Sequence, residues 1–441
     1  MSYRPVINLR NGFFLYVLAY RLFLDLVYIF VISPRFSYSG LIYKSSVLNS
    51  IISWFTLLIF YIAIRSVLIY NGDRISFSIV SILFFVSFIP FTTCISVGLV
   101  NWGFIIFNSV YWFVLIIGMI LIKSIPVKPF ASFSFSKIKI DKRFITLVGI
   151  ASLLLVLYIS WRYTHFRLNF SLYDVYDLRM EARTYSFPRI IAYLFSWTLA
   201  INPILFGLCL IKKDWFMASI YFIVQMLSFG VDGLKSTFFM PFIVALCIYF
   251  FKSNDIIKLK KIIILCLTIL AILGLLEAVI HKSTYLSDIG IRRMLFVPNQ
   301  LGEYYFDFFS KNEPDFFRSS FLRYIGIQSP YTTDGFKGFT YIIGWQYFGK
   351  STMNCNNGLS SDAMANFGIF GCVIMPIFLI ISLHLFDRST INVNKKLSII
   401  SGIYIAYILL STTLTTVLLT HGLLLLMLLM SIIGNDNTNK E

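Results

Sequence analysis

The sequence predicts an all-α, polytopic integral membrane protein: one membrane domain over residues 1–441, with about twelve transmembrane helices. Hydrophobic residues make up 58% of the chain and charged residues only 13%, against roughly 25% charged residues in a typical soluble domain. The apolar residues form long blocks, as expected when lipid is the solvent. Because these blocks do not alternate apolar and polar residues, they indicate helices and exclude a transmembrane barrel.

The spans follow from hydropathy along the chain. The run 397–433 is too long for one helix, so we split it near Thr412 to Thr416. The stretch 215–251 also reads as one broken or re-entrant pair around Gly230 to Ser236. The predicted spans are 12–32, 47–69, 76–98, 101–122, 144–161, 189–211, 215–229, 237–251, 262–280, 368–386, 397–413 and 416–433.

Lysine and arginine in the short loops give the orientation, because such residues collect on the cytoplasmic side. Four basic segments, at 123–143, 212–213, 252–261 and 388–396, fall on one side if every span crosses once. We therefore expect both termini in the cytoplasm. The net charge of +17 is then mostly topological, and without a soluble basic domain it does not indicate nucleic-acid binding.

Two predicted external loops are long, 162–188 and 281–367, and both are rich in arginine. A guanidinium is a rigid, permanently charged fork that suits phosphate and carboxylate groups. A lipid-linked diphosphate at the outer leaflet is such a target, and salt bridging to carboxylates of these loops is the alternative. The arginines include Arg162, Arg167, Arg179, Arg183, Arg292, Arg293, Arg318 and Arg323, and the carboxylates are Asp174, Asp177, Glu181, Glu303 and Asp307.

Three further external features are candidates for binding. The turn from Gly230 to Ser236 places Lys235 beside the free backbone N–H groups of a helix start, which favours an anion. From Leu301 on, an aromatic amphipathic helix with Tyr304 and Tyr305 suits either the membrane interface or packing beneath the loop. The segment 354–371 carries Asn356, Asp362 and Asn366 just before a span, where polar groups can bind sugar hydroxyls or simply form a polar loop.

Ionisable residues inside spans are few. Arg21 and Asp25 lie four residues apart on one helix face, a spacing at which they neutralise each other. Glu277 and His281 repeat this spacing near the external end of the ninth span, where Glu277 is an acid–base candidate or half of a structural pair. The four histidines show no metal-ligand spacing, so neither a metal nor another cofactor is expected.

The large second loop carries a resemblance to a known family. Its pattern comprises Arg292, Arg293, Pro298, Tyr304 to Phe309, Ser319, Gly344, Asn356, Asp362, Gly368 and Gly371, with Gly233, Lys235 and Ser236 in the preceding turn. Together with the plan of about twelve spans, this pattern resembles the Wzy-type O-antigen polymerases, the oligosaccharide repeat-unit polymerases of the bacterial inner membrane.

The resemblance implies a metal-independent glycosyltransferase that joins undecaprenyl-diphosphate-linked repeat units at the periplasmic face into O-antigen or capsular polysaccharide. It implies partners in the chain-length regulator and the flippase of the same pathway, and contact with membrane lipids. The external cations would hold the diphosphate and stabilise its departing charge. The candidate catalytic residues are Arg179, Arg183, Arg292, Arg293, Arg323, Glu277 and His281, and the candidate substrate-binding residues are Lys235, Asn356, Asp362, Asn366, Tyr304 and Tyr305.

Other classes of protein remain open on the sequence alone. A lipid-linked oligosaccharide flippase has a similar number of spans, but it has no need of a large external loop. An O-antigen ligase shares the lipid diphosphate donor and much of the architecture. An acyltransferase would want a paired histidine and carboxylate, for which Glu277 and His281 are the only candidates. A channel or scaffold is the remaining alternative.

Overall fold

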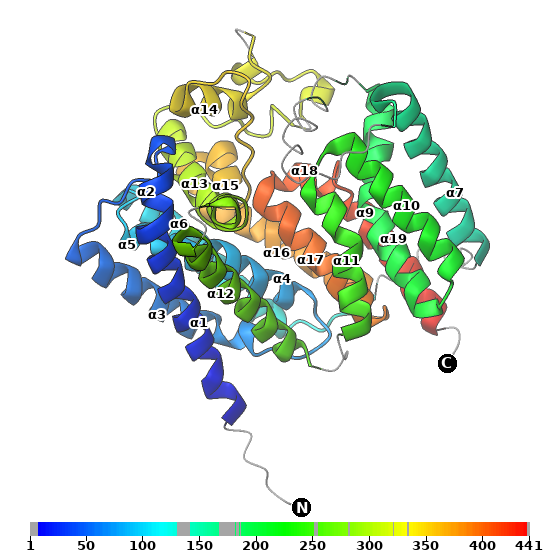
Figure 1. Cartoon of the computed structure of the whole chain (residues 1–441), viewed down its shortest axis with the longest axis horizontal. Helices are drawn as coiled ribbons and strands as arrows, with labels where there is room; N and C mark the ends of the chain where they lie inside the picture. Colours follow the sequence, from blue (N-terminus) through cyan, green and yellow to red (C-terminus); the bar gives the residue numbers. More distant parts are fainter. Residues whose placement is uncertain are drawn as a thin grey trace, which may run out of the picture.

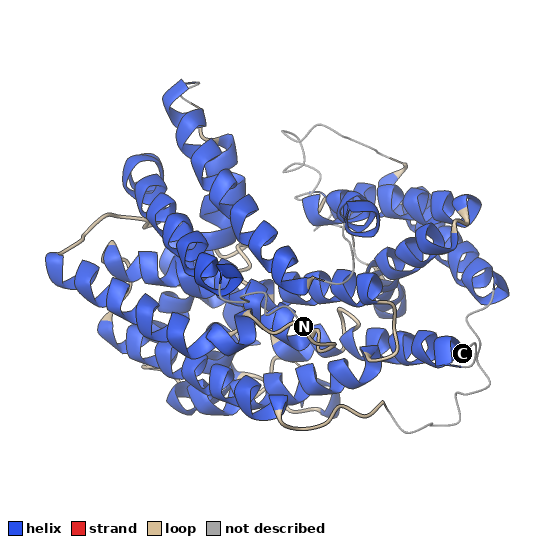
Figure 2. Ribbon diagram, turned by 90° about the horizontal axis from the view of Figure 1, so that it is seen from below, coloured by secondary structure: helices blue, strands red, loops and turns tan. Residues whose placement is uncertain are grey.

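The structure is a computed structural model of the whole chain. The residues that it describes are helical or in loops, and no strand occurs among them (Figure 2). They are residues 8–129, 142–166, 181, 185, 187–250, 255–280, 283–320, 322–332 and 335–438.

Each predicted span contains helix among the described residues, although the span 416–433 is interrupted by a turn at 419–422. Ten helical stretches there are long and apolar enough to cross a membrane, which confirms a polytopic helical protein. The predicted spans 237–251 and 397–413 correspond to two shorter helices, α11 and α17. The helices are α1 (Asn8–Val27), α2 (Ser33–Phe36), α3 (Val47–Leu68), α4 (Ser76–Leu83), α5 (Ile89–Ser96), α6 (Trp102–Lys123), α7 (Lys142–Ile159), α9 (Arg189–Lys212), α10 (Trp215–Asp232), α11 (Lys235–Phe250), α12 (Ile256–Ile280), α13 (Val297–Phe309), α14 (Phe339–Phe348), α15 (Ser360–Phe367), α16 (Gly371–Thr390), α17 (Lys395–Ser411), α18 (Leu414–Leu418) and α19 (Leu423–Thr438).

Local sequence signals set several helix ends. The side chains of Ser46, Asn101 and Asp214 accept backbone N–H bonds at the starts of α3, α6 and α10, as capping residues do. Gly233 has a left-handed backbone (φ +61°) and ends α10, where a residue with a β-carbon is disfavoured. The stretch 215–251 is therefore two separate helices, which pack against each other and against α9.

The helices form two groups joined by α17 and the α16–α19 contact. In one group α6 packs on α16, α1 on α12 and α3 on α5, while in the other α10 packs on α7, α9 and α11. Helix α17 touches α4 of the first group and α9 of the second. Glycine allows close approach at these seams, because a β-carbon at Gly118 would meet Ile380 of α16 and one at Gly207 would meet Leu397 of α17.

Basic residues from separate loops meet at one end of the bundle. Arg388 Nε donates to the Lys128 carbonyl at 3.0 Å, and Lys395 lies 3.7 Å from Asp73. Lys260 Nζ donates to the Val67 carbonyl at 2.9 Å. These segments lie at a common end, as the charge pattern predicted. Helix α1 begins and α19 ends at this end, the lower one in Figure 1.

The predicted Arg21–Asp25 pair is present inside the bundle. Arg21 is fully buried and its guanidinium forms an ion pair with Asp25. It also donates to Thr92 Oγ1 at 2.9 Å and to Ser53 Oγ at 3.1 Å, and it lies over the Trp54 ring. The charge therefore has polar partners on three helices, as a charge buried among apolar helices requires.

The predicted large loop 281–367 contains helices of its own. A π-helical segment, η6 (Ser287–Phe296), runs into α13, and both pack onto α5 of the first group. Helices α13, α14 and α15 lie toward the upper end in Figure 1, opposite the basic loops. Tyr305 is 1% exposed and donates to the Cys355 carbonyl at 2.9 Å, so α13 is packed beneath the loop, one of the two arrangements weighed for its aromatic residues.

Candidate functional site

The candidate site includes two arginines of the second long loop, residues 281–367. Arg292 forms an ion pair with Asp288 one turn earlier, and Arg293 lies 3.6 Å from the other oxygen of the same carboxylate. Asp288 is therefore a partner of both arginines, and it was not among the carboxylates considered from the sequence. Two guanidiniums thus share one carboxylate. The Arg293 side chain is 40% exposed.

Lys235 lies next to this segment. Its ammonium nitrogen is 3.0 Å from the Tyr285 hydroxyl and also lies over the Tyr285 ring, two residues before η6 begins. The backbone N–H of Leu234 donates to Asp232 at 2.8 Å, and Thr237 Oγ1 donates to the other Asp232 oxygen at 2.6 Å. A carboxylate of the chain thus already occupies the helix start where the sequence predicted an anion. We call Lys235, Arg292 and Arg293 the basic cluster.

Glu277 accepts hydrogen bonds from residues 283–286, which lead into η6. One of its oxygens accepts from Ser283 Oγ and Tyr285 N, at 2.8 and 2.9 Å, and the second accepts from Leu286 N at 2.9 Å. A carboxylate that accepts backbone N–H groups at a helix start stabilises that helix. Glu277 therefore positions the turn that carries the basic cluster. Of the remaining catalytic candidates, Arg323 is exposed, and Arg179, Arg183 and His281 lie outside the described residues.

A polar pocket opens at the same end of the bundle, between the second loop and the link from α17 to α18. Its volume is about 250 Å³. Asn354, Asn356 and Asn366 line it from the loop, facing threonines of the segment 412–416. Two substrate-binding residues predicted from the sequence, Asn356 and Asn366, therefore meet in one cavity with a segment about fifty residues further along the chain.

Asp362 supports this pocket from behind. Its carboxylate is buried and accepts from Asn366 Nδ2 and from the backbone N–H of Leu414, both at 2.7 Å. The Asn366 Oδ1 in turn accepts from the backbone N–H of Phe317 at 2.7 Å. These bonds tie α15, the start of α18 and the loop turn together, so the two sides of the pocket are held in register.

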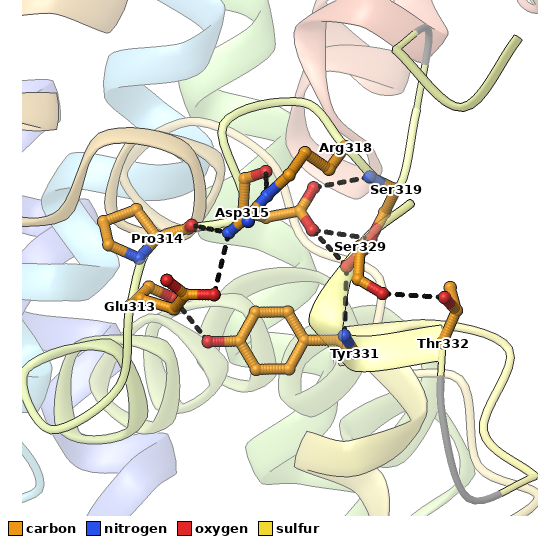
Figure 3. Close-up of polar contacts among 8 residues, drawn as sticks. All are labelled: Glu313, Pro314, Asp315, Arg318, Ser319, Ser329, Tyr331 and Thr332. Carbon is orange, nitrogen blue, oxygen red and sulfur yellow. Dashed lines mark hydrogen bonds and ion pairs between the residues drawn. The ribbon is translucent and has the colours of Figure 1, made fainter. Parts of the chain in front are cut away.

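Asp315 organises the loop wall of the pocket (Figure 3). One oxygen accepts from Ser319 Oγ at 2.9 Å and Ser329 Oγ at 2.5 Å, while the other accepts from Ser319 N at 2.7 Å. The backbone N–H of Asp315 donates to the Ala365 carbonyl at 2.7 Å. The Asp315 carboxylate thus joins two other parts of the loop, and its backbone N–H joins this turn to α15.

The chain turns sharply beside Asp315. Phe316 and Phe317 both have left-handed backbones (φ +49° and +61°), which side chains of this size rarely adopt. Phe317 packs on the Phe367 ring at 5.3 Å, and Arg318 braces the turn by donating to the carbonyls of Pro314 and Asp315. Strained backbone that its surroundings hold in place is a common mark of functional sites.

Helix α17 connects the pocket to the basic cluster. The Tyr407 hydroxyl is 3.0 Å from Ser236 Oγ, beside Lys235. Thr412 at the pocket follows Tyr407 by five residues, which is about 7.5 Å along a helix. The ammonium of Lys235 and the polar pocket are therefore neighbours on one side of the bundle.

An ionisable group lies on α13 as well. Glu303 accepts from the backbone N–H of Asn101 at 3.0 Å, and burial raises the pKa of Glu303 from 4.5 to about 7. The bonds that Asp307 accepts, from Lys311 first and then from Tyr347, lower the pKa of that carboxyl. The ring of Tyr304, a substrate-binding candidate, stacks on Tyr347 at 4.4 Å and so serves to fix α14 on α13.

Sequence reasoning missed several residues of this site. Asp288 and Asp315 were not singled out, because an acidic residue in a polar loop carries no signal of what it will bond. The segment 412–416 was treated only as a break between spans. Its dense run of threonines between apolar stretches was a usable signal. Among the described residues, no group of three His, Cys, Asp or Glu side chains is placed to hold a metal ion.

The fold and site together define a multi-pass helical membrane protein with a polar pocket and a cationic helix turn at one end. No known protein family, curated protein or solved structure matches the chain.

Proposed function

We propose that the protein is a glycosyltransferase that polymerises undecaprenyl-diphosphate-linked oligosaccharide repeat units into O-antigen or capsular polysaccharide. The observation that carries the proposal is the pairing of two unlike surfaces at one end of the bundle. The basic cluster offers cations for a diphosphate, and the neighbouring pocket offers uncharged hydroxyl and amide groups for sugar. A lipid-linked glycan presents these two chemistries side by side.

The reaction has simple requirements. The bond between the anomeric carbon of the growing glycan and its diphosphate oxygen breaks, and the diphosphate leaves on its lipid. A hydroxyl oxygen of the incoming repeat unit bonds to that carbon and loses its proton. The Arg292 and Arg293 guanidiniums and the Lys235 ammonium would stabilise the departing charge, which is the work of a preorganised cationic site. Holding both glycans at one site supplies the proximity that the transfer needs.

The topology in this proposal has twelve crossings, including the shorter α11 and α17. The end with the basic loops and both termini would face the cytoplasm, in agreement with the positive-inside trend. Residues 162–188 and 281–367 would then face the periplasm of a bacterial inner membrane, where the chain-length regulator and the flippase of the pathway also work. Cysteines placed at Asn312 and at Asn394 test this, because only the former should react with an impermeant maleimide in whole cells with a permeabilised outer membrane.

A strain that lacks the protein tests the activity. We expect its surface lipid to carry single repeat units and no long polymer, because ligation continues without polymerisation. Surface lipid with no repeat unit would instead indicate a ligase, and precursors stranded inside the cell would indicate a flippase. Unchanged polymer would contradict the proposal.

A further inference from the structure

Asp288 occupies the edge of the Arg292 guanidinium where an anionic ligand would bind. Its Oδ1 accepts from Arg292 Nε at 2.5 Å and forms an ion pair with Nη2 of the same guanidinium, while its Oδ2 lies 3.6 Å from Arg293 Nη2. Phosphate oxygens bind guanidinium N–H groups in the same way as carboxylate oxygens. The Asp288 side chain is 25% exposed, so the pair is open to exchange with an anion from outside.

Arg292 has a second contact that does not involve this carboxylate. Its guanidinium carbon lies 4.6 Å from the centroid of the Phe36 ring, and Phe36 is buried at the end of α2. A guanidinium over an aromatic ring is attracted to the face of that ring. The backbone of the turn is fastened as well, because Asp288 N donates to the Thr284 carbonyl at 2.7 Å. The guanidinium therefore keeps its position when the carboxylate releases it.

A partner on the same helical turn is a permanent competitor. Asp288 and Arg292 are four residues apart, so the carboxylate stays beside the guanidinium at a high effective concentration. A diphosphate has to displace it before it can accept the same hydrogen bonds. The displaced carboxylate also stays nearby and repels the bound anion. Asp288 thus weakens the binding of an anion to the arginines.

Weaker binding matters most for the release of product. In the proposed reaction the lipid diphosphate that leaves carries the same charged group as the lipid that must enter next. A site that bound this group too tightly would stay occupied, and product release limits the turnover of many enzymes.

We propose that Asp288 is an internal counter-ion that competes with the diphosphate product for Arg292 and Arg293 and so shortens the time for which that product stays bound. The inference rests on the proposed function for the identity of the anion, and it deepens that function by naming what regulates the site. Asp288 touches no reacting atom in this account, so it is a positioning residue.

The experiment measures the binding of inorganic pyrophosphate to the full-length protein in nanodiscs by titration calorimetry. Asp288→Asn keeps the shape of the side chain and removes its charge. Asp307→Asn is the matched control, because Asp307 forms an ion pair at the same spacing with Lys311 in the same loop. Asp288→Asn combined with Arg292→Ala shows whether a change in affinity depends on the guanidinium.

We expect Asp288→Asn to bind pyrophosphate about tenfold tighter than the wild type, which corresponds to 1.4 kcal/mol. Asp307→Asn should bind as the wild type does, and the added Arg292→Ala should remove the gain. In the polymerisation reaction Asp288→Asn should lower both kcat and KM. If Asp288 only stabilised the turn, its loss would weaken binding instead.

Four results would overturn the inference: equal or weaker binding by Asp288→Asn, an equal gain in Asp307→Asn, a gain that persists without Arg292, or no binding by any variant. The proposed function is tested separately by the deletion strain. If polymer is lost there but Asp288→Asn binds pyrophosphate no tighter, the function stands and the role of Asp288 fails. If polymer persists there while Asp288→Asn binds tighter, the competition at the arginines stands and the proposed function fails.

Discussion

The two ends of the bundle use basic residues in different ways. At the end of the bundle where the basic loops meet, Lys260, Arg74 and Lys396 donate to carbonyls in the last turns of α3, α6 and α11. This is the end at which α1 begins, the lower one in Figure 1. In the second loop, residues 281–367 at the opposite end, Arg292 and Arg293 form ion pairs with Asp288, and Arg318 lies 3.1 Å from Glu313.

The difference lies in the partner. A helix C-terminus carries partial negative charge and leaves carbonyls without partners, so a cation there completes the helix and has a structural role. A guanidinium that is paired with a side-chain carboxylate can exchange that partner for another anion. Lysine and arginine therefore indicate a structural role at the lower end of the bundle, whereas at the upper end paired arginines indicate ligand binding.

The largest effect is expected from Lys260→Ala. Lys260 is fully buried and its ammonium donates to the carbonyls of Val67 and Leu68. Its loss should cost about 2–3 kcal/mol, because it removes a charged donor from the buried Leu68 carbonyl and one of the donors to the Val67 carbonyl. Thermal unfolding in detergent and the amount of protein in the membrane measure this. Lys258→Ala, on the exposed side of the same helix, is the control, and equal effects of the two would contradict the structural role.

Arg292→Ala and Arg293→Ala should show the opposite pattern. We expect polymer yield to fall about tenfold or more, since a hydrogen bond to a charged group is worth about 1.5–3 kcal/mol, while protein in the membrane stays constant. Gel analysis of surface polysaccharide beside an immunoblot measures both. Arg388→Ala at the lower end should leave polymer unchanged, and a loss of polymer there as large as in the cluster would break the distinction between the ends.

Asp315→Asn tests the rigidity of the upper end. The variant removes a charged acceptor that holds Ser319 and Ser329, at a cost of roughly 1–3 kcal/mol within the loop. Limited proteolysis of the detergent-solubilised protein should cut residues 310–332 faster than in the wild type. Glu313→Gln changes a largely exposed carboxylate of the same loop and should not alter the rate. Unchanged cleavage in Asp315→Asn would show that the loop is held by other contacts.

The smallest effect concerns pH. Burial raises the pKa of Glu303 to about 7 from 4.5, so the folded protein holds a proton that the unfolded chain releases. The stability from this proton is fully present below about pH 4.5 and is lost as pH rises through 7. The melting temperature should therefore fall between pH 5 and 7.5, and less so in Glu303→Gln.

Asp307→Asn is the control for that measurement. The pKa of Asp307 is lowered, so this group titrates below the range of pH 5 to 7.5. The melting temperature of Asp307→Asn should therefore fall with pH as steeply as that of the wild type. If the melting temperature of Glu303→Gln fell with pH as steeply as that of the wild type, a group other than Glu303 would be the one that titrates.

The sequence predicted the helices better than the site, for a physical reason. Spans are contiguous blocks, so hydropathy alone located them, and even the break near Thr412 was correct because polar threonines interrupt an apolar run. The pocket joins Asp315, Asn354 and Thr412–Thr416, which come together only through packing. Asn356 and Asn366 were predicted because they lie together in a polar segment, while Asp315 lacked any such local signal.

The central claim is that the upper end transfers glycan between lipid diphosphates. The most direct measurement incubates the purified protein in nanodiscs with undecaprenyl-diphosphate-linked repeat units and follows glycan length and released undecaprenyl diphosphate. The account predicts a ladder of longer glycans with one lipid diphosphate released for each unit added, and neither product with Arg292→Ala/Arg293→Ala. Absence of both products with the wild-type protein, or an equal ladder with the double variant, would contradict it.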